Sequence, residues 1–395
     1  MRGNLYKMKN SKIFSLLLTA CATLLLWGEF IPADEFLRNR IPISDIKKFT
    51  SSSNPVSCFD PETQTIYSPY HAAFSGYGEQ VSVFAMAETP IPAVKGAKNH
   101  ILLQNGVAFE GKKYRNPVDA SAIMLGDKVR VWFLADGKDY YFFDWSKTEH
   151  KISGGIHKLM CKTGDSAPVP LNADAVRKFL DANGCTRYRL ERDPRENIIM
   201  TARPSWDGDT FYGTVTSGWS QPILFRCSDG KTIEFLSVIP NIAQYECTVA
   251  LLNGKVYALL RGTVRGANFF VADAGEWKFR PCGRLPAAET RAQMLTHNGK
   301  LLIAYSRNNI QPNKIRNGRN NMIILEGEGE DLKQYKEIFR VVDEIGFVSF
   351  DIVDCNGGLY VIWSNSERFP DQPVPVSGKV ALQGKDVLFC SKLTK

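Results

Sequence analysis

The sequence predicts an all-β chain that folds as a six-bladed β-propeller and carries one small, partly helical insertion. Two observations support this prediction: a hairpin pattern that recurs along the chain, and the even spacing of its turn glycines. The clearest copy spans residues 245–261, where apolar positions alternate on either side of Asn253-Gly254. An Asn-Gly pair between two alternating segments is typical of a tight β-hairpin.

The same hairpin pattern occurs six times in all. Each copy has an apolar strand, a turn that usually contains glycine, and a strand rich in Val, Leu, Tyr and Trp. The other five copies begin at Val56, Ser121, Ile198, Ala292 and Phe350. The turn glycines Gly208, Gly254, Gly299 and Gly357 lie 46, 45 and 58 residues apart. A period near fifty residues with several short strands per unit indicates a β-propeller, and six copies indicate six blades.

One interval of the repeat is longer than the others. Gly126 and Gly208 lie 82 residues apart, and the sequence between them includes NADAVRKFLDANGC. Asn172 is a suitable helix N-cap, and Gly184 is a suitable end of the same helix. We therefore expect residues 151–195 to form an insertion with one short helix, and residues 31–395 as a whole to form the propeller.

Residues 1–30 have the layout of a secretory signal peptide, because basic residues precede an apolar run from Ile13 to Trp27. A run of about fifteen residues is short for a membrane span. We expect an exported protein without a transmembrane domain, located in the periplasm, at the cell surface or outside the cell. Leu18-Thr19-Ala20-Cys21 resembles a lipoprotein cleavage box, so a lipid anchor on Cys21 is an alternative, although the chain stays apolar to Leu26.

Eight cysteines follow Cys21, and two interpretations are open for them. Export permits disulfides, and Cys161 with Cys185 could close the insertion; buried free thiols are the alternative. No Cys-x-x-Cys pair or His-rich spacing is present, so we expect no structural zinc and no cofactor. The formal charge of +8 is not concentrated in a dense Lys/Arg run after the leader, which favours an acidic sugar over nucleic acid as the partner. We expect a monomer.

The hairpin at Asn253-Gly254 places two charged residues side by side. One strand begins after Glu246 and its partner ends on Arg261, so both residues lie at the open end of the hairpin. A guanidinium is always charged and its planar fork binds a carboxylate through two parallel hydrogen bonds. The two residues form either a structural ion pair or part of a site for an anionic ligand.

Blades four to six, residues 241–364, resemble the sialidase superfamily of six-bladed propellers. Ser228-Asp229-Gly230-Lys231-Thr232, with Phe235 after it, is also similar to the Asp-box turn of bacterial-neuraminidase repeats. The resemblance implies that Arg261 and Arg319 grip a substrate carboxylate at the propeller axis. It also implies that Glu246 assists catalysis by polarising a tyrosine.

The chain departs from that family at two positions. Val348 stands where the family has its tyrosine nucleophile, and a valine cannot form a glycosyl-enzyme bond. Ser53 stands where the first blade supplies an arginine. Arg40-Ile41-Pro42 spells the family motif but comes too early in the chain, whereas Arg115 lies in a similar motif on the second blade and is a third candidate for binding the substrate.

Glycoside hydrolysis also needs an acid/base carboxylate. Glu79 and Asp119 are the candidates in the region where the family keeps its aspartate, with His71 and His157 as alternatives for a histidine-based mechanism. We therefore expect a sialidase-like glycoside hydrolase that acts on a terminal acidic sugar. The alternatives are a non-catalytic glycan-binding propeller and a structural or protein-interaction propeller.

Overall fold

The computed structural model describes residues 29–45, 51–53, 55–73, 83–92, 96–137, 139–185, 198–217, 219–240, 243–244, 246–261, 268–285, 292–306, 321–342, 349–365, 374–375, 381–382 and 387–395. Residues 1–28, which include Cys21 and most of the predicted signal peptide, lie outside these ranges. No helix among the described residues has the length and apolar character that crossing a membrane requires.

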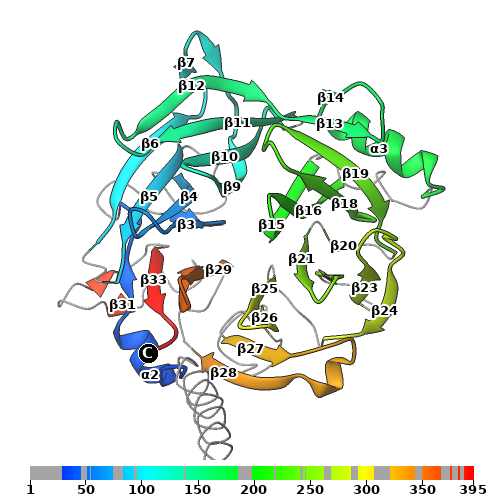
Figure 1. Ribbon diagram of the computed structural model, residues 1–395. Coiled ribbons are helices and arrows are strands. Elements are labelled where there is room, and N and C mark those ends of the chain that lie inside the picture. Colours follow the sequence, from blue (N-terminus) through cyan, green and yellow to red (C-terminus); the bar gives the residue numbers. More distant parts are fainter. Residues whose placement is uncertain are drawn as a thin grey trace, which may run out of the picture.

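Six sheets stand around one axis, each sheet is a blade, and its strands pair antiparallel except for the parallel pair β13 and β19 in blade three (Figure 1). Blade one contains β2 (Ser51–Ser53), β3 (Cys58–Asp60), β4 (Thr65–Ala73), β5 (Val83–Pro90) and β6 (Lys98–Gln104). Blade two contains β9 (Val118–Leu125), β10 (Lys128–Ala135), β11 (Asp139–Ser146) and β12 (Lys151–Lys158). Blade three contains β15 (Ile198–Asp207), β16 (Thr210–Ser217), β18 (Ile223–Cys227) and β19 (Thr232–Val238), extended by β13 (Met160–Thr163) and β14 (Val169–Pro170).

The remaining three blades follow the same up-and-down order. Blade four contains β21 (Cys247–Leu252), β22 (Lys255–Leu260), β23 (Phe269–Asp273) and β24 (Arg280–Gly283). Blade five contains β25 (Gln293–His297), β26 (Lys300–Tyr305), β27 (Asn321–Gly327) and β28 (Lys336–Val342). Blade six contains β29 (Ser349–Cys355), β30 (Gly358–Ser364), β33 (Leu388–Lys392) and β1 (Ile41–Pro42).

Several short helices and strand pairs are present in addition to the blade strands. They are the helices α2 (Ala33–Arg38) and α3 (Ala173–Ala182), the 3₁₀ turn η2 (Leu332–Gln334), and the strand pairs β7 (Ala108–Phe109) with β8 (Lys112–Lys113), β17 (Trp219–Ser220) with β20 (Ala243–Gln244), and β31 (Val374–Pro375) with β32 (Ala381–Leu382).

The six predicted hairpins form the inner strands, which confirms the propeller prediction. The inner strands β3, β9, β15, β21, β25 and β29 contact one another in ring order around the axis (Figure 1). Asn253 and Gly254 have φ angles of 52° and 71°, which the tight hairpin turn requires at both central residues. We call the face at which the inner strands begin the entry face, and the opposite face the exit face.

The hydrophobic core lies between neighbouring blades, where side chains of adjacent sheets interdigitate. Phe84 of blade one and Phe133 of blade two have ring centroids 5.5 Å apart. Trp132 of blade two and Phe211 of blade three are 5.2 Å apart and almost fully buried. Apolar side chains on the faces of each sheet pack against the neighbouring sheet. The hydrophobic core is therefore a series of layers between blades rather than one central cluster.

Blade six is completed by the N-terminal segment. β1 pairs with β33, the last strand, with Ile41 opposite Cys390 and Pro42 opposite Phe389. Arg40 precedes this strand and is buried with its guanidinium carbon 5.6 Å from the Phe389 ring centroid. The Arg40-Ile41-Pro42 motif is therefore part of the outer edge of a blade, where the arginine packs on aromatic rings.

The predicted insertion 151–195 is too long at its N-terminal side. Residues 151–158 are β12, the fourth strand of blade two, paired with β11. Its sequence KISGGIHK is mostly exposed and poor in apolar residues, so its pattern does not mark it as a strand. The helix is confirmed as α3, and the Asn172 side chain accepts a hydrogen bond from the Ala175 N–H at 2.9 Å.

The eight cysteines of the described residues are free thiols, which decides between the two interpretations left open: Cys161 and Cys185 form no disulfide, and the buried-thiol alternative holds. Both sulfurs are instead buried in the apolar layer around α3, where small apolar side chains pack well. Burial raises the pKa of the Cys161 thiol to about 12, so this group stays protonated and unreactive at neutral pH.

Polar contacts also fasten blades together. The Asp229 carboxylate accepts from the N–H groups of Lys231 and Thr232, both at 2.8 Å, and closes the Ser228–Thr232 turn. The carbonyls of Asp229 and Gly230 accept from Arg130 and Trp132 of blade two, at 2.7 and 2.9 Å. This turn therefore has a structural role between blades two and three.

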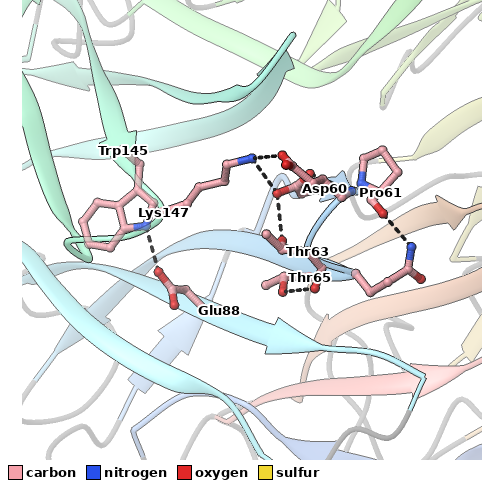
Figure 2. A network of polar contacts seen from close by, with 9 residues as sticks. Asp60, Pro61, Thr63, Thr65, Glu88, Trp145 and Lys147 are labelled. Atoms are coloured by element: carbon pink, nitrogen blue, oxygen red, sulfur yellow. Dashed lines mark hydrogen bonds and ion pairs between the residues drawn. The ribbon is translucent and has the colours of Figure 1, made fainter.

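A second polar contact joins blades one and two on the exit face (Figure 2). The Lys147 ammonium donates to the Asp60 carboxylate at 2.8 Å, and Thr63 donates to the same carboxylate at 2.7 Å. Asp60 is 1% exposed and Lys147 15%. Since a buried carboxylate needs compensating charge and hydrogen bonds, this cluster stabilises the junction of the two blades.

Candidate functional site

Glu246 and Arg261 lie at the open end of the blade-four hairpin, on the entry face. Glu246 immediately precedes β21 and Arg261 immediately follows β22. The Arg261 N–H donates to the Glu246 carbonyl at 2.9 Å, which continues the strand register by one pair. The Arg261 guanidinium donates to the Glu246 carboxylate, so the juxtaposition predicted from the hairpin is present as an ion pair.

This ion pair is partly shielded from water. The Arg261 side chain is 19% exposed and that of Glu246 is 16% exposed. Charges at such a site attract each other more strongly than at a fully solvated surface, because the effective dielectric constant is lower. Glu246 therefore fixes the orientation of the guanidinium, and the remaining exposure leaves the pair accessible from the entry face.

Asp119 and His71 meet at the junction of blades one and two, also on the entry face. The Asp119 N–H donates to His71 Nε2 at 2.8 Å, so the neutral imidazole carries its proton on Nδ1. Asp119 has a φ of 48°, an uncommon conformation for a residue with a side chain. His71 is 7% exposed and lies opposite Ser53 in the β2–β4 register. Two candidates that are 48 residues apart in the sequence are thus neighbours.

Arg115 lies in the loop that leads into β9 and is exposed on the entry face. Its N–H donates to the Asp136 carboxylate at 3.1 Å, and its carbonyl accepts from the Asp136 N–H at 2.8 Å. These bonds hold the backbone of the loop near the top of blade two. His157, by contrast, is on the outer strand β12, far from the inner strands in sheet order.

Glu79, Arg319 and Val348 lie outside the described residues. Their roles as acid/base, carboxylate-binding arginine and replaced nucleophile therefore stay predictions. Among the described candidates, Glu246, Arg261, Asp119, His71 and Arg115 all lie at the same end of the inner strands.

The sequence does not reveal a polar cluster on the axis itself. Arg203 of β15 donates to the Asp351 carboxylate of β29 at 3.2 Å and to the Ser57 carbonyl at 2.7 Å. Asp351 is fully buried and also accepts from the Ser57 N–H at 2.7 Å. Blades one, three and six are joined by these bonds. No spacing rule links three residues so distant in sequence, and only ring closure brings them together.

A cavity of about 500 Å³ lies on blade three, away from the Glu246–Arg261 pair. It is lined by Lys162, Pro168, Thr210, Tyr212, Arg226, Cys227, Ser228, Asp229, Thr232 and Glu234. Arg226 and Glu234 form a two-point ion pair at 3.1 and 3.2 Å within it. The Arg226 side chain is 45% exposed, whereas that of Arg261 is 19% exposed, so water screens the charge of Arg226 more strongly and the cavity is a weaker candidate for an anionic ligand than the entry face.

Neither a protein-family model nor a curated protein sequence matches the chain. Solved structures do match. A mutant of Trypanosoma rangeli sialidase displaying trans-sialidase activity aligns with a TM-score of 0.54 at 10% identity, over 93% of this chain and 60% of that one. Trypanosoma rangeli sialidase in complex with sialic acid aligns with a TM-score of 0.52 at 11% identity, over 92% and 57%.

The chain spans about 60% of the length of these sialidase chains. At 10–11% identity the likeness concerns the arrangement of strands and blades, not individual residues. The conclusion is one of fold: this chain is a six-bladed β-propeller with the fold of the sialidases.

Proposed function

We propose that the chain is an exported glycoside hydrolase that acts on a terminal acidic sugar, with its binding site on the entry face. The observation that carries the proposal is the Glu246–Arg261 ion pair, partly shielded at the start of blade four. The fold is that of the sialidases, and Trypanosoma rangeli sialidase, which shares it, was solved in complex with sialic acid, an acidic sugar.

The chemistry begins with recognition of the sugar carboxylate by Arg261. A guanidinium can bind two carboxylates at once through different N–H groups, so Glu246 can stay in contact and hold the fork in place. Arg115, on the same face, and Arg319 are the further cations of the site. Placing the carboxylate first fixes the position of the glycosidic bond relative to the protein.

Bond cleavage then needs a proton donor for the leaving oxygen and an activated nucleophile. Asp119 is the described carboxylate that best fits the role of acid/base, with Glu79 as the other candidate. Val348 excludes a tyrosine nucleophile at that position. We therefore propose that the carboxylates activate a water molecule directly, without a tyrosyl-enzyme intermediate.

The test combines product analysis with calorimetric titration. The wild type is incubated with glycans that end in sialic or hexuronic acids, and the released sugars are identified. Arg261→Ala should weaken binding of the matching free sugar about 30- to 150-fold, since a hydrogen-bonded contact between charged groups contributes about 2–3 kcal/mol. Arg280→Ala is the matched control, because Arg280 forms an exposed ion pair with Glu330 at the outer strand of the same blade. Unchanged affinity in Arg261→Ala would place the anion site elsewhere.

Val348 also supports a second candidate function, a glycan-binding propeller without catalysis. Saturable binding of an acidic sugar that depends on Arg261, with no released product from any glycan of the panel, would favour this second function. Absence of both binding and turnover would leave the third, structural interpretation of the propeller as the remaining one.

A further inference from the structure

A second cluster of chemically competent side chains lies on the exit face, between blades one and two. Glu88 near the end of β5, His100 near the start of β6 and His150 in the turn before β12 direct one ligand atom each toward a common point. These atoms all lie within 4.8 Å of one another. Glu246 and Arg261 lie on the opposite face, so this cluster is independent of the proposed function.

The distances between the Glu88 carboxylate and the two histidine nitrogens are close to those between ligand atoms that bind one metal ion. The Glu88 carboxylate oxygen Oε2 is 2.9 Å from His150 Nδ1 and 3.6 Å from His100 Nε2. Ligand atoms bound to one tetrahedral ion with bonds of about 2.0–2.1 Å lie roughly 3.3 Å apart. Only small side-chain rotations are needed to bring the three atoms to such a sphere.

His100 has a feature that packing alone does not explain. Its Nε2 atom is buried and has no hydrogen-bond partner among the described residues, although the Glu88 carboxylate is nearby. A buried polar atom without a partner has a free-energy cost, and a bound ion would remove it.

Surrounding residues position the carboxylate. Trp145 Nε1 donates to the Glu88 oxygen Oε1 at 2.8 Å, as Figure 2 shows, while His150 Nδ1 lies 3.0 Å from Oε1 and 2.9 Å from Oε2. The Trp145 ring also packs against His100, with centroids 5.2 Å apart. Such outer contacts orient the ligands of metal sites and raise their affinity.

We propose that Glu88, His100 and His150 bind a transition-metal ion of the zinc class. Two imidazole nitrogens and one carboxylate suit zinc, cobalt or nickel, whereas calcium and magnesium prefer oxygen ligands alone. Glu88 is 6% exposed, His100 22% and His150 36%, so the site opens to solvent at His150. A water molecule completes the coordination there, and the ion joins blade one to blade two.

The first experiment titrates the metal-free wild type with zinc in a calorimeter. We expect one ion per chain and a higher melting temperature in zinc. His100→Gln and His150→Gln should each lose at least 100-fold in affinity and lose the thermal shift. Trp145→Phe keeps all three ligands but should lose 10- to 100-fold, the usual effect of removing an outer-shell partner. His157→Gln, on β12 of the same blade, is the matched control and should bind zinc as the wild type does.

The cobalt(II) spectrum of the wild type needs no variant and covers the case in which a substitution unfolds the chain. Intense visible bands without a sulfur-to-metal charge-transfer band would support tetrahedral nitrogen and oxygen ligation. A charge-transfer band would mean that a cysteine binds the ion and would overturn the proposal. Failure of the wild type to bind zinc, or equal binding by His100→Gln and the wild type, would also overturn it.

Discussion

At the scale of single residues, this propeller keeps several charges in places that water hardly reaches, and some of them are matched by a partner from another blade. Asp60 is the clearest case. Burial alone raises the pKa of its carboxyl group, but hydrogen bonds from Lys147, Thr63 and the Glu62 N–H outweigh burial and hold the pKa below its usual value. The charged carboxylate is therefore the form that the folded state prefers.

Lys147→Met should lower the free energy of unfolding by about 2–3 kcal/mol at pH 7, because the Asp60 carboxylate loses the cation that compensates its burial. A carboxyl group with a lowered folded-state pKa stabilises the fold above its unfolded pKa, and this contribution is lost as the pH falls through the folded pKa. The cost of the substitution should therefore shrink as acid protonates Asp60. Urea unfolding at pH 7 and at progressively lower pH measures both effects.

Lys151→Met is the control, since among the described residues Lys151 forms an ion pair with Glu149 alone, and both side chains are exposed. It should change stability by less than about 0.5 kcal/mol. Equal costs for the two lysine substitutions at pH 7 would contradict the assigned role of Lys147.

Residue positions within one hairpin could be predicted from the sequence, whereas pairs between blades could not. Glu246 and Arg261 meet because the Asn253-Gly254 turn fixes their register, and both the turn and the register are local. His100 and His150 are fifty residues apart and share no motif. Their proximity depends on how blade two packs on blade one, so the expectation of no zinc site considered only local spacing.

At the scale of elements, some turns pack against a neighbouring blade as well as reversing the direction of the chain. Gly230 has a φ of 65°, and a Cβ placed on it would lie 2.4 Å from Leu125 Cδ1 and 3.0 Å from the Arg130 side chain. Gly208, in the same blade, has a φ of 59° and open space around it. The two glycines thus differ in packing and not in backbone conformation.

Gly230→Ala should destabilise the fold by about 2–4 kcal/mol, of which about 1–2 kcal/mol is the backbone strain of a positive φ and the rest is the clash with blade two. Gly208→Ala should cost only the strain. Chemical denaturation of both variants measures the difference. Equal costs would mean that blade two moves aside freely and that the Ser228–Thr232 turn does not fasten it.

The sequence could predict the inner hairpins but not all outer strands. The two strands of each inner hairpin are apolar on both faces, since each face packs against a neighbouring blade, and this pattern is strong in segments such as residues 128–135, the second strand of the blade-two hairpin. The outer strand β12 has a mostly exposed sequence with two adjacent glycines, so it was assigned to the insertion. Its position is set by hydrogen bonds to β11 rather than by its own composition.

At the scale of the whole molecule, the ring is closed by a strand from the start of the chain. β1 adds to β33 in blade six, the Ile43 N–H donates to the Leu388 carbonyl at 2.8 Å, and the Leu388 N–H donates to the Ser44 hydroxyl at 3.0 Å. The sequence gives little sign of this closure, because a two-residue strand has no periodicity. Arg40-Ile41-Pro42 resembles a motif that the sialidase family carries in blade one, and this resemblance does not predict a strand in blade six.

A chain that begins at residue 46 should therefore be far less stable than one that begins at residue 29. Residues 29–45 bury Ile31, Phe36 and Ile43 almost completely, and each such side chain contributes about 1.5–3 kcal/mol. Their sum approaches the total stability of an ordinary domain, about 5–15 kcal/mol. We expect the shorter chain to be unfolded or molten at 37 °C, with loss of its near-ultraviolet circular dichroism.

A synthetic peptide of residues 29–45 should restore that signal, because it binds only the folded ring, with Ile31 and Phe36 packed on blades five and six and Ile43 on blades one and six, and so shifts the equilibrium toward the folded state. The same peptide with Phe36→Ala and Ile43→Ala should not, because it retains the backbone hydrogen bonds of β1 but loses most of the apolar surface that the segment buries. If the chain that begins at residue 46 melts at the same temperature as the longer one, β33 is an adequate edge strand by itself, and the packing of blade six on its two neighbours, rather than the added strand, closes the ring.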